Sequence, residues 1–74
     1  MEGILKFDLT EERSEFELAV NAYKWYAVAW DMDQQLRKLT KHASDDTPSE
    51  VVKALYNVRE DLRQIMLQHG VDFD

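Results

Sequence analysis

The sequence contains no cysteine, one proline and only two glycines among its 74 residues. Without cysteine there is no disulfide and no thiolate zinc site, so packing alone must hold a chain of this size together. The glycines, Gly3 and Gly70, lie too far apart for a glycine-rich phosphate loop. No apolar run approaches the roughly 20 residues that a membrane-spanning helix requires. These absences predict one small domain over residues 1–74, soluble and cytoplasmic, without a membrane association.

The net charge of −6 is distributed unevenly. Residues 1–20 carry −4, residues 21–44 carry +2, and residues 45–74 carry −4. Binding to a phosphate backbone requires clustered basic side chains. One small basic patch on an acidic chain therefore argues against direct nucleic-acid binding and favours a protein partner that has a basic surface.

The N-terminal stretch "ILKFDL" alternates between apolar and polar residues. Leu5, Phe7 and Leu9 share one side, which is typical of a short β-strand or an extended arm. A single strand leaves its backbone groups unpaired. We therefore expect this segment to pair with another chain or to lie across the helices.

A helical pattern follows, with Thr10 as the expected N-cap, and continues to His42. Its apolar residues form two stripes about 180° apart on a helical wheel. The first stripe contains Phe16, Val20, Tyr23, Ala27 and Trp30, and the second contains Trp25, Ala29, Met32, Leu36 and Leu39. Either the helix breaks near Asn21–Ala22, or one continuous helix packs against partners on two sides. Asparagine accepts cap conformations, which favours the break.

The segment "HASDDTPSE" is the one clear linker. Within it, Thr47, Pro48 and Glu50 form a capping-box pattern, and Gly70 marks the end of the following helix. The apolar stripe expected to face the core comprises Val51, Leu55, Val58, Leu62, Ile65 and His69. The sequence thus predicts a mainly α fold in which the short N-terminal strand or arm precedes two or three helices, at about 11–20, 23–42 and 48–69.

No arrangement of side chains indicates catalysis. Asp31 and Asp33 lie two residues apart on a helix and point in different directions, so they are interpreted as solvated acids and not as a metal site. His42 and His69 lie at helix C-termini, where they complement the helix dipole. We therefore expect no enzyme activity, no cofactor and no bound metal.

The stretch "YKWYAVAWDMD" at residues 23–33 places apolar side chains on both sides of a helix. A small domain needs large side chains in its core, so the aromatic residues of this segment serve either the core alone or the core and an interface. Tyrosine and tryptophan are also enriched at interface hot spots. We assign Trp25 to the core, facing the last helix. The predicted partner-binding surface combines aromatic and acidic side chains: Tyr23, Tyr26, Trp30, Glu11, Glu12 and Glu15. This surface would bind another protein or, in a homodimer, a second copy.

Three sequence blocks resemble a family of small, uncharacterised accessory proteins encoded by tailed bacteriophages. They are "LKFDLTEERSEFELAVNAYKW", "WDMDQQLRKLTKH" and "VREDLRQIMLQHGVDFD", which together span nearly the whole chain. Where that pattern has glycine or serine after the asparagine, this chain has Ala22, which weakens the case for a sharp break there. The resemblance implies an accessory protein with no reaction to transfer.

Two functions are consistent with these observations. In the first, the protein binds and inhibits a host nucleic-acid-handling or defence protein in the host cytoplasm, through an acidic and aromatic surface. In the second, it is a small structural or assembly protein that acts as a homo-oligomer and has no inhibitory role.

Overall fold

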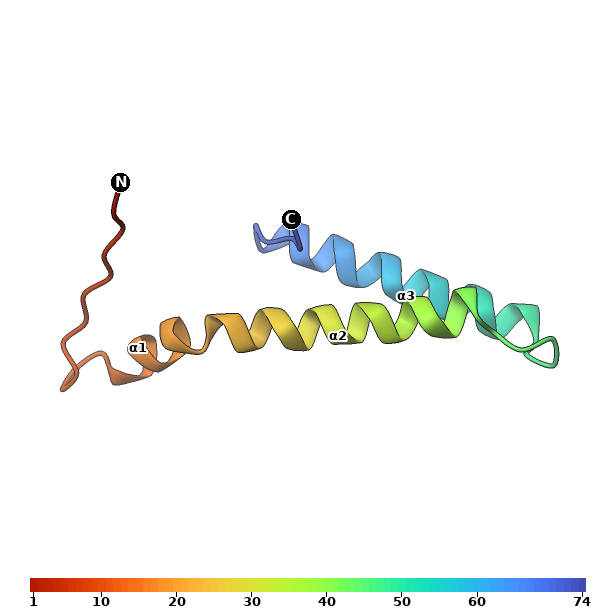
Figure 1. The fold of residues 1–74 in the computed structure, drawn as a ribbon, viewed down its shortest axis with the longest axis horizontal. Coiled ribbons are helices and arrows are strands. Elements are labelled where there is room, and N and C mark those ends of the chain that lie inside the picture. Colours follow the sequence, from red (N-terminus) through yellow and green to blue (C-terminus); the bar gives the residue numbers. More distant parts are fainter.

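The computed structural model describes all 74 residues and contains three helices and no β-strand. These are α1 (Arg13–Val20), α2 (Ala22–Lys41) and α3 (Ser49–Gln68). Helices α2 and α3 form an antiparallel hairpin, while α1 extends beyond its open end, so that the molecule measures 55 × 23 × 20 Å (Figure 1). The predicted mainly α fold is confirmed, with three helices where two or three were predicted.

The helix breaks at Asn21, as the sequence favoured. The Asn21 N–H donates to the carbonyl of Glu17 at 3.0 Å and so ends α1. The Asn21 carbonyl accepts hydrogen bonds from the N–H groups of Lys24 (2.9 Å) and Trp25 (3.2 Å), which begins α2. One residue with φ −94° and ψ 6° thus serves both helices, without a glycine. The alternative of one continuous helix is wrong.

The N-terminal residues form an extended arm and not a β-strand (Figure 1, red). No neighbouring strand is present to pair with their backbone groups. The arm is anchored by Phe7, whose ring meets that of Phe16 edge-on with centroids 6.0 Å apart. Leu5, Ala19 and Val20 border the same small apolar cluster. Of the two predicted conformations, the extended arm is therefore the one that forms.

Helix α1 begins later than predicted, and Thr10 is not its N-cap. The Asp8 carboxylate accepts hydrogen bonds from the N–H and the hydroxyl of Thr10, and the Glu12 carboxylate accepts one from the Asp8 N–H at 3.0 Å. The Asp8 carbonyl also accepts bonds from the N–H groups of Glu11 and Glu12. Asp8 therefore organises a turn that uses these amides before α1 starts at Arg13.

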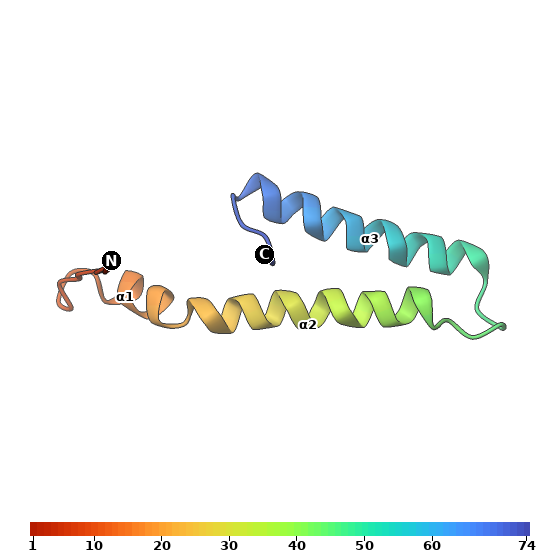
Figure 2. The same ribbon diagram turned by 45° about the horizontal axis from the view of Figure 1, so that its top comes forward.

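The predicted capping box at the start of α3 is also wrong. The Thr47 hydroxyl lies 3.0 Å from the Ser44 hydroxyl, and no side chain caps the helix. The predicted end is confirmed, since Gly70 adopts a positive φ of 74°. Its N–H donates to the Leu67 carbonyl, and the Val71 N–H donates to that of Met66, both at 3.0 Å. This Schellman motif turns the C-terminal tail back towards α2 (Figure 2).

The seam between α2 and α3 follows alternating steps of three and four residues, as in a coiled coil. It contains Ala22, Tyr26, Ala29, Asp33, Leu36 and Thr40 from α2, and Val52, Leu55, Arg59, Leu62 and Met66 from α3. Only Asp33 and Leu36 are buried. Leu55 and Leu62 lie in the seam as predicted, at intermediate exposure, whereas Val51, Val58 and Ile65 are exposed. The predicted α3 stripe was thus rotated by about one residue.

Candidate protein-binding surface

The least exposed side chain of the molecule is that of Asp33, which is fully buried between α2 and α3. Arg59 donates from Nε to Oδ1 at 3.0 Å and from Nη2 to Oδ2 at 3.3 Å. Arg63 donates to the same two oxygens, at 3.2 and 3.1 Å. Two guanidinium groups thus hold one carboxylate in paired, charge-assisted hydrogen bonds. The prediction that Asp33 is a solvated acid is wrong, because both arginines come from the facing helix.

The electrostatics of this ionic cluster follow from its hydrogen bonds. The bonds from Arg59 lower the pKa of Asp33, burial opposes that effect, and the bonds from Arg63 add to it. The bonds with Asp33 in turn raise the pKa of Arg63. The two guanidinium groups and the one carboxylate together carry one net positive charge. Arg63 is 43% exposed, so part of this charge reaches the surface.

The C-terminal tail returns to α2 and places Phe73 beside the aromatic segment. The Tyr26 hydroxyl donates to the Phe73 carbonyl at 2.9 Å. The Phe73 ring meets the rings of Trp30 and Tyr26 edge-on, with centroids 5.2 and 5.9 Å away, and the Arg63 guanidinium lies 4.9 Å from its centre. These are favourable aromatic and cation–π geometries. The tail therefore joins the open ends of α2 and α3.

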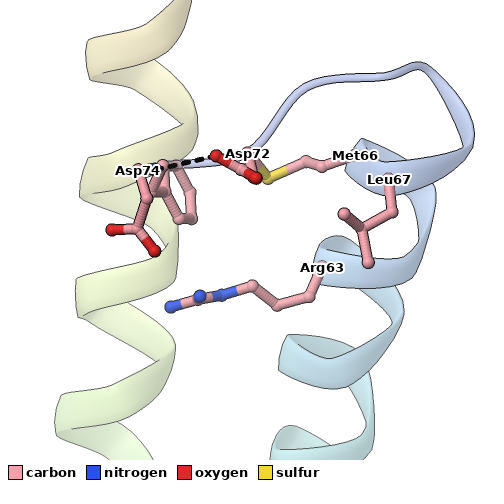
Figure 3. Close-up of a pocket in the computed structure, with 6 residues that line it drawn as sticks. Arg63, Met66, Leu67, Asp72 and Asp74 are labelled. Atoms are coloured by element: carbon pink, nitrogen blue, oxygen red, sulfur yellow. Dashed lines mark hydrogen bonds between the residues drawn. The ribbon is translucent and has the colours of Figure 1, made fainter.

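Two hollows flank the returning tail. Figure 3 shows the first, of about 280 Å³, where Arg63 extends from α3 towards α2 below the acidic end of the tail. Its lining consists of Arg63, Met66, Leu67, Asp72, Phe73 and Asp74. The second hollow, of about 300 Å³, is almost entirely apolar and is lined by Ala22, Trp25, Tyr26, Ala29, Met66, Val71, Asp72 and Phe73. No group of three or more carboxylate or imidazole side chains is close enough to hold a metal ion.

The structure brings the three predicted aromatic residues together but corrects the assignment of the tryptophans. Tyr23 and Tyr26 stack with centroids 6.3 Å apart, and Tyr26 and Trp30 share Phe73 as a neighbour. Tyr23 is 78% exposed and Trp30 is 40% exposed. Trp25, which the sequence assigned to the core, is 62% exposed. That assignment is wrong because the residue of α2 that enters the seam at this turn is Tyr26, one position after Trp25.

The predicted acidic residues lie apart from this aromatic group, on α1 and the turn before it. Glu11, Glu12 and Glu15 are all exposed. Glu12 is engaged by the Asp8 amide, whereas Glu11 and Glu15 form no side-chain hydrogen bond and no ion pair. The one ion pair of this segment joins Arg13 to Glu17 at 3.6 Å, with both side chains more than half exposed. The predicted surface is therefore divided between two helices.

Sequence reasoning missed Asp33, Arg59, Arg63 and Phe73. A signal for Arg59 was present, since it occupies a seam position between Leu55 and Leu62 at the coiled-coil spacing. Nothing local indicated Phe73, because its role depends on the turn at Gly70.

No helix combines the length and the apolar character needed to cross a membrane. No known protein family, curated protein or solved structure matches this chain. The phage resemblance accordingly stays a prediction.

Proposed function

We propose that the protein acts by binding another protein, and that its partner is a host nucleic-acid-handling or defence protein with a basic surface. In this proposal the chain is a phage-encoded accessory protein that works in the host cytoplasm. It inhibits its partner by occupying the surface that would otherwise bind a phosphate backbone.

The observation that carries the proposal is the separation of charge along the molecule. Residues 1–20 contain six acidic and two basic side chains, and only Glu17 forms an ion pair. Residues 21–44, by contrast, carry a net charge of +2, and the one buried acid among them, Asp33, is neutralised by two arginines. The N-terminal end therefore presents carboxylates that no internal cation satisfies. Such a cluster accelerates association with a basic surface and competes with phosphate groups for the same lysines and arginines.

The aromatic residues supply the apolar part of the proposed interface. Tyr23 lies in the first turn of α2, directly after α1, and so adjoins the acidic segment in the chain. Tyr26 and Trp30 are held by their contacts with Phe73 before any partner arrives. Side chains fixed in advance lose less conformational freedom on binding. Binding should thus combine a salt-dependent association step with an aromatic anchor.

The experiment is affinity capture from bacterial lysate, followed by mass spectrometry and a DNA-displacement assay on each purified captured protein. The test variant is Glu11→Lys with Glu15→Lys, which leaves Glu12 to bond the Asp8 amide. The matched control is Asp45→Lys with Asp46→Lys, the same charge change in the exposed linker at the other end of the molecule. We expect the wild type and the control to capture a nucleic-acid-binding protein and displace its DNA, and the test variant to lose both.

Capture that is equal for both variants and insensitive to salt would contradict the electrostatic proposal. Captured proteins that bind no nucleic acid would contradict the proposed class of partner.

The exposed apolar side chains favour a second candidate, a structural or assembly role as a homo-oligomer without inhibition. This role predicts that no nucleic-acid-handling protein is captured and that the chain still associates with itself.

A further inference from the structure

Both long helices carry a second apolar stripe that is exposed in the structure. Each of its residues stands one position before a residue of the α2–α3 seam. On α2 these are Trp25, Val28, Met32 and Leu39, and on α3 they are Val51, Val58 and Ile65. Their exposure ranges from 43% for Leu39 to 62% for Trp25.

The two stripes lie on the same side of the hairpin. In an α-helix, each residue lies about 100° around the helix axis from the residue that follows it. Because α2 and α3 run in opposite directions and face each other, this rotation carries both stripes to the same flank. The seven residues therefore lie on one surface, which we call the apolar face; Gln35 and Asp61 are the polar residues of α2 and α3 that stand at the same position relative to the seam. Tyr23, Trp30 and Arg63 stand one position after seam residues and so lie on the opposite flank.

The shape of the apolar face suits another helix. Two neighbouring hollows along α2 are bordered by Asn21, Lys24, Trp25 and Val28, and by Val28, Asp31, Met32 and Gln35. Each set has the spacing i, i+3, i+4 and i+7. Four side chains at this spacing form the hole that receives a side chain from a facing helix in coiled-coil packing. Here both holes are open.

The exposed area shows how much surface is uncovered. The chain exposes 6,696 Å², whereas a compact monomer of 8.7 kDa exposes roughly 4,700 Å². The excess of roughly 2,000 Å² includes the extended N-terminal arm as well as the apolar face, and it is more than the roughly 800 Å² that each partner contributes to a standard interface. Leu36 is the only buried apolar side chain, too little to offset the conformational entropy lost on folding.

We propose that the apolar face is covered by the apolar face of a second copy, so that two hairpins form a four-helix bundle. A second copy is the one partner that is present wherever the chain itself folds, and symmetric dimers are the commonest oligomers. Two chains of net charge −6 repel each other, so self-association is favoured where the contact surface is least charged. The acidic N-terminal segments are poor contacts, whereas the seven residues of the apolar face are uncharged. Asp61 is the one ionisable side chain that stands within the stripe, and Lys24 and Asp31 lie at its edge.

This dimer leaves the opposite flank and the acidic segment free, so it does not depend on the proposed function.

The first experiment measures the mass of the full chain in solution by sedimentation equilibrium. We expect twice 8.7 kDa for the wild type at micromolar concentration. Met32→Glu, on the apolar face, should shift the mass to the monomer value or abolish helicity. The matched control is Leu67→Glu on the opposite flank, because Leu67 and Met32 are both 56% exposed. The control should remain a folded dimer. A wild type that is helical and monomeric at high micromolar concentration would overturn the proposal.

The second experiment avoids variants that fail to fold. Iodide quenching is measured separately for Trp25 and Trp30, in the Trp30→Phe and Trp25→Phe variants, as the chain concentration rises. Covering the apolar face should protect Trp25 with increasing concentration and leave Trp30 unchanged. Protection of Trp30 alone, or loss of the dimer in Leu67→Glu but not in Met32→Glu, would place the interface on the other flank and overturn the proposal.

Discussion

Carboxylates and arginines occur both at the centre of the α2–α3 hairpin and in the segment of residues 1–20, but their surroundings differ. At the centre, Asp33 is fully buried and bonded to Arg59 and Arg63. In the N-terminal segment, Arg13 and Glu17 meet at 3.6 Å while both remain more than half exposed. Water screens the second pair and is excluded from the carboxylate of the first.

The comparison indicates that similar side chains serve different purposes in the two regions. Buried charges that lose their partner are strongly destabilising, so the central cluster is expected to matter for folding. Exposed charges contribute little to stability and remain available to partners. Substitutions in the two regions should therefore differ in both size and kind of effect.

The largest effect is expected for Asp33→Ala. It leaves the two guanidinium groups of α3, which lie side by side in the seam, without their carboxylate, and should reduce the free energy of unfolding by about 3 kcal/mol. The control is Asp31→Ala, which removes an exposed carboxylate two residues away and should change stability by less than about 0.5 kcal/mol. Denaturant unfolding at a fixed chain concentration measures both. Equal effects of the two substitutions on the free energy of unfolding would contradict the expectation that a buried, paired carboxylate matters more for stability than an exposed one.

A smaller effect is expected on acidification, because a protonated Asp33 still accepts hydrogen bonds. The folded chain holds the pKa of Asp33 below its ordinary value of 3.8. The resulting stability is therefore fully present above about pH 4 and is lost as the pH falls through the lowered pKa. The difference in unfolding free energy between wild type and Asp33→Asn should thus shrink below pH 4. A difference that stays constant down to pH 2 would contradict the assignment.

The smallest effect is expected for Arg13→Ala. Loss of the exposed ion pair with Glu17 should change the free energy of unfolding by at most about 0.5 kcal/mol. The substitution makes the N-terminal segment more acidic, so under the proposed function it should strengthen binding to a basic partner at low salt. Thermal unfolding and a salt series of the binding assay check the two expectations. Marked destabilisation would show that α1 depends on this pair.

The sequence predicted the helix positions well because their boundaries are local. Asn21 separates α1 from α2, and Gly70 closes α3 in a backbone conformation that glycine adopts readily. It predicted the packing faces less well. A prediction based on apolar spacing places Arg59 on the surface. In the structure Arg59 bonds to Asp33 in the seam, so α3 is rotated and its most apolar stripe does not face α2. The stripe that looked like the core is consequently exposed.

The packing of the aromatic residues could not be predicted from the sequence either. Whether Trp25 or Trp30 is covered depends on Phe73, more than forty residues later in the chain. The spacing of aromatic residues within α2 contains no information about that contact. The grouping of Tyr23, Tyr26 and Trp30 was nevertheless visible, because it depends only on helical spacing.

The ionic cluster also determines how far the two helices can slide along each other. A seam of leucines alone would tolerate a shift by one heptad, since each apolar side chain would meet another. Here a shift would separate the Asp33 carboxylate from both arginines and leave it among apolar side chains. Replacing all three residues together by leucine or methionine should therefore preserve stability and yet allow several alignments of α2 and α3. The ionic cluster thus fixes the register of α2 and α3, and its three residues can be replaced only together.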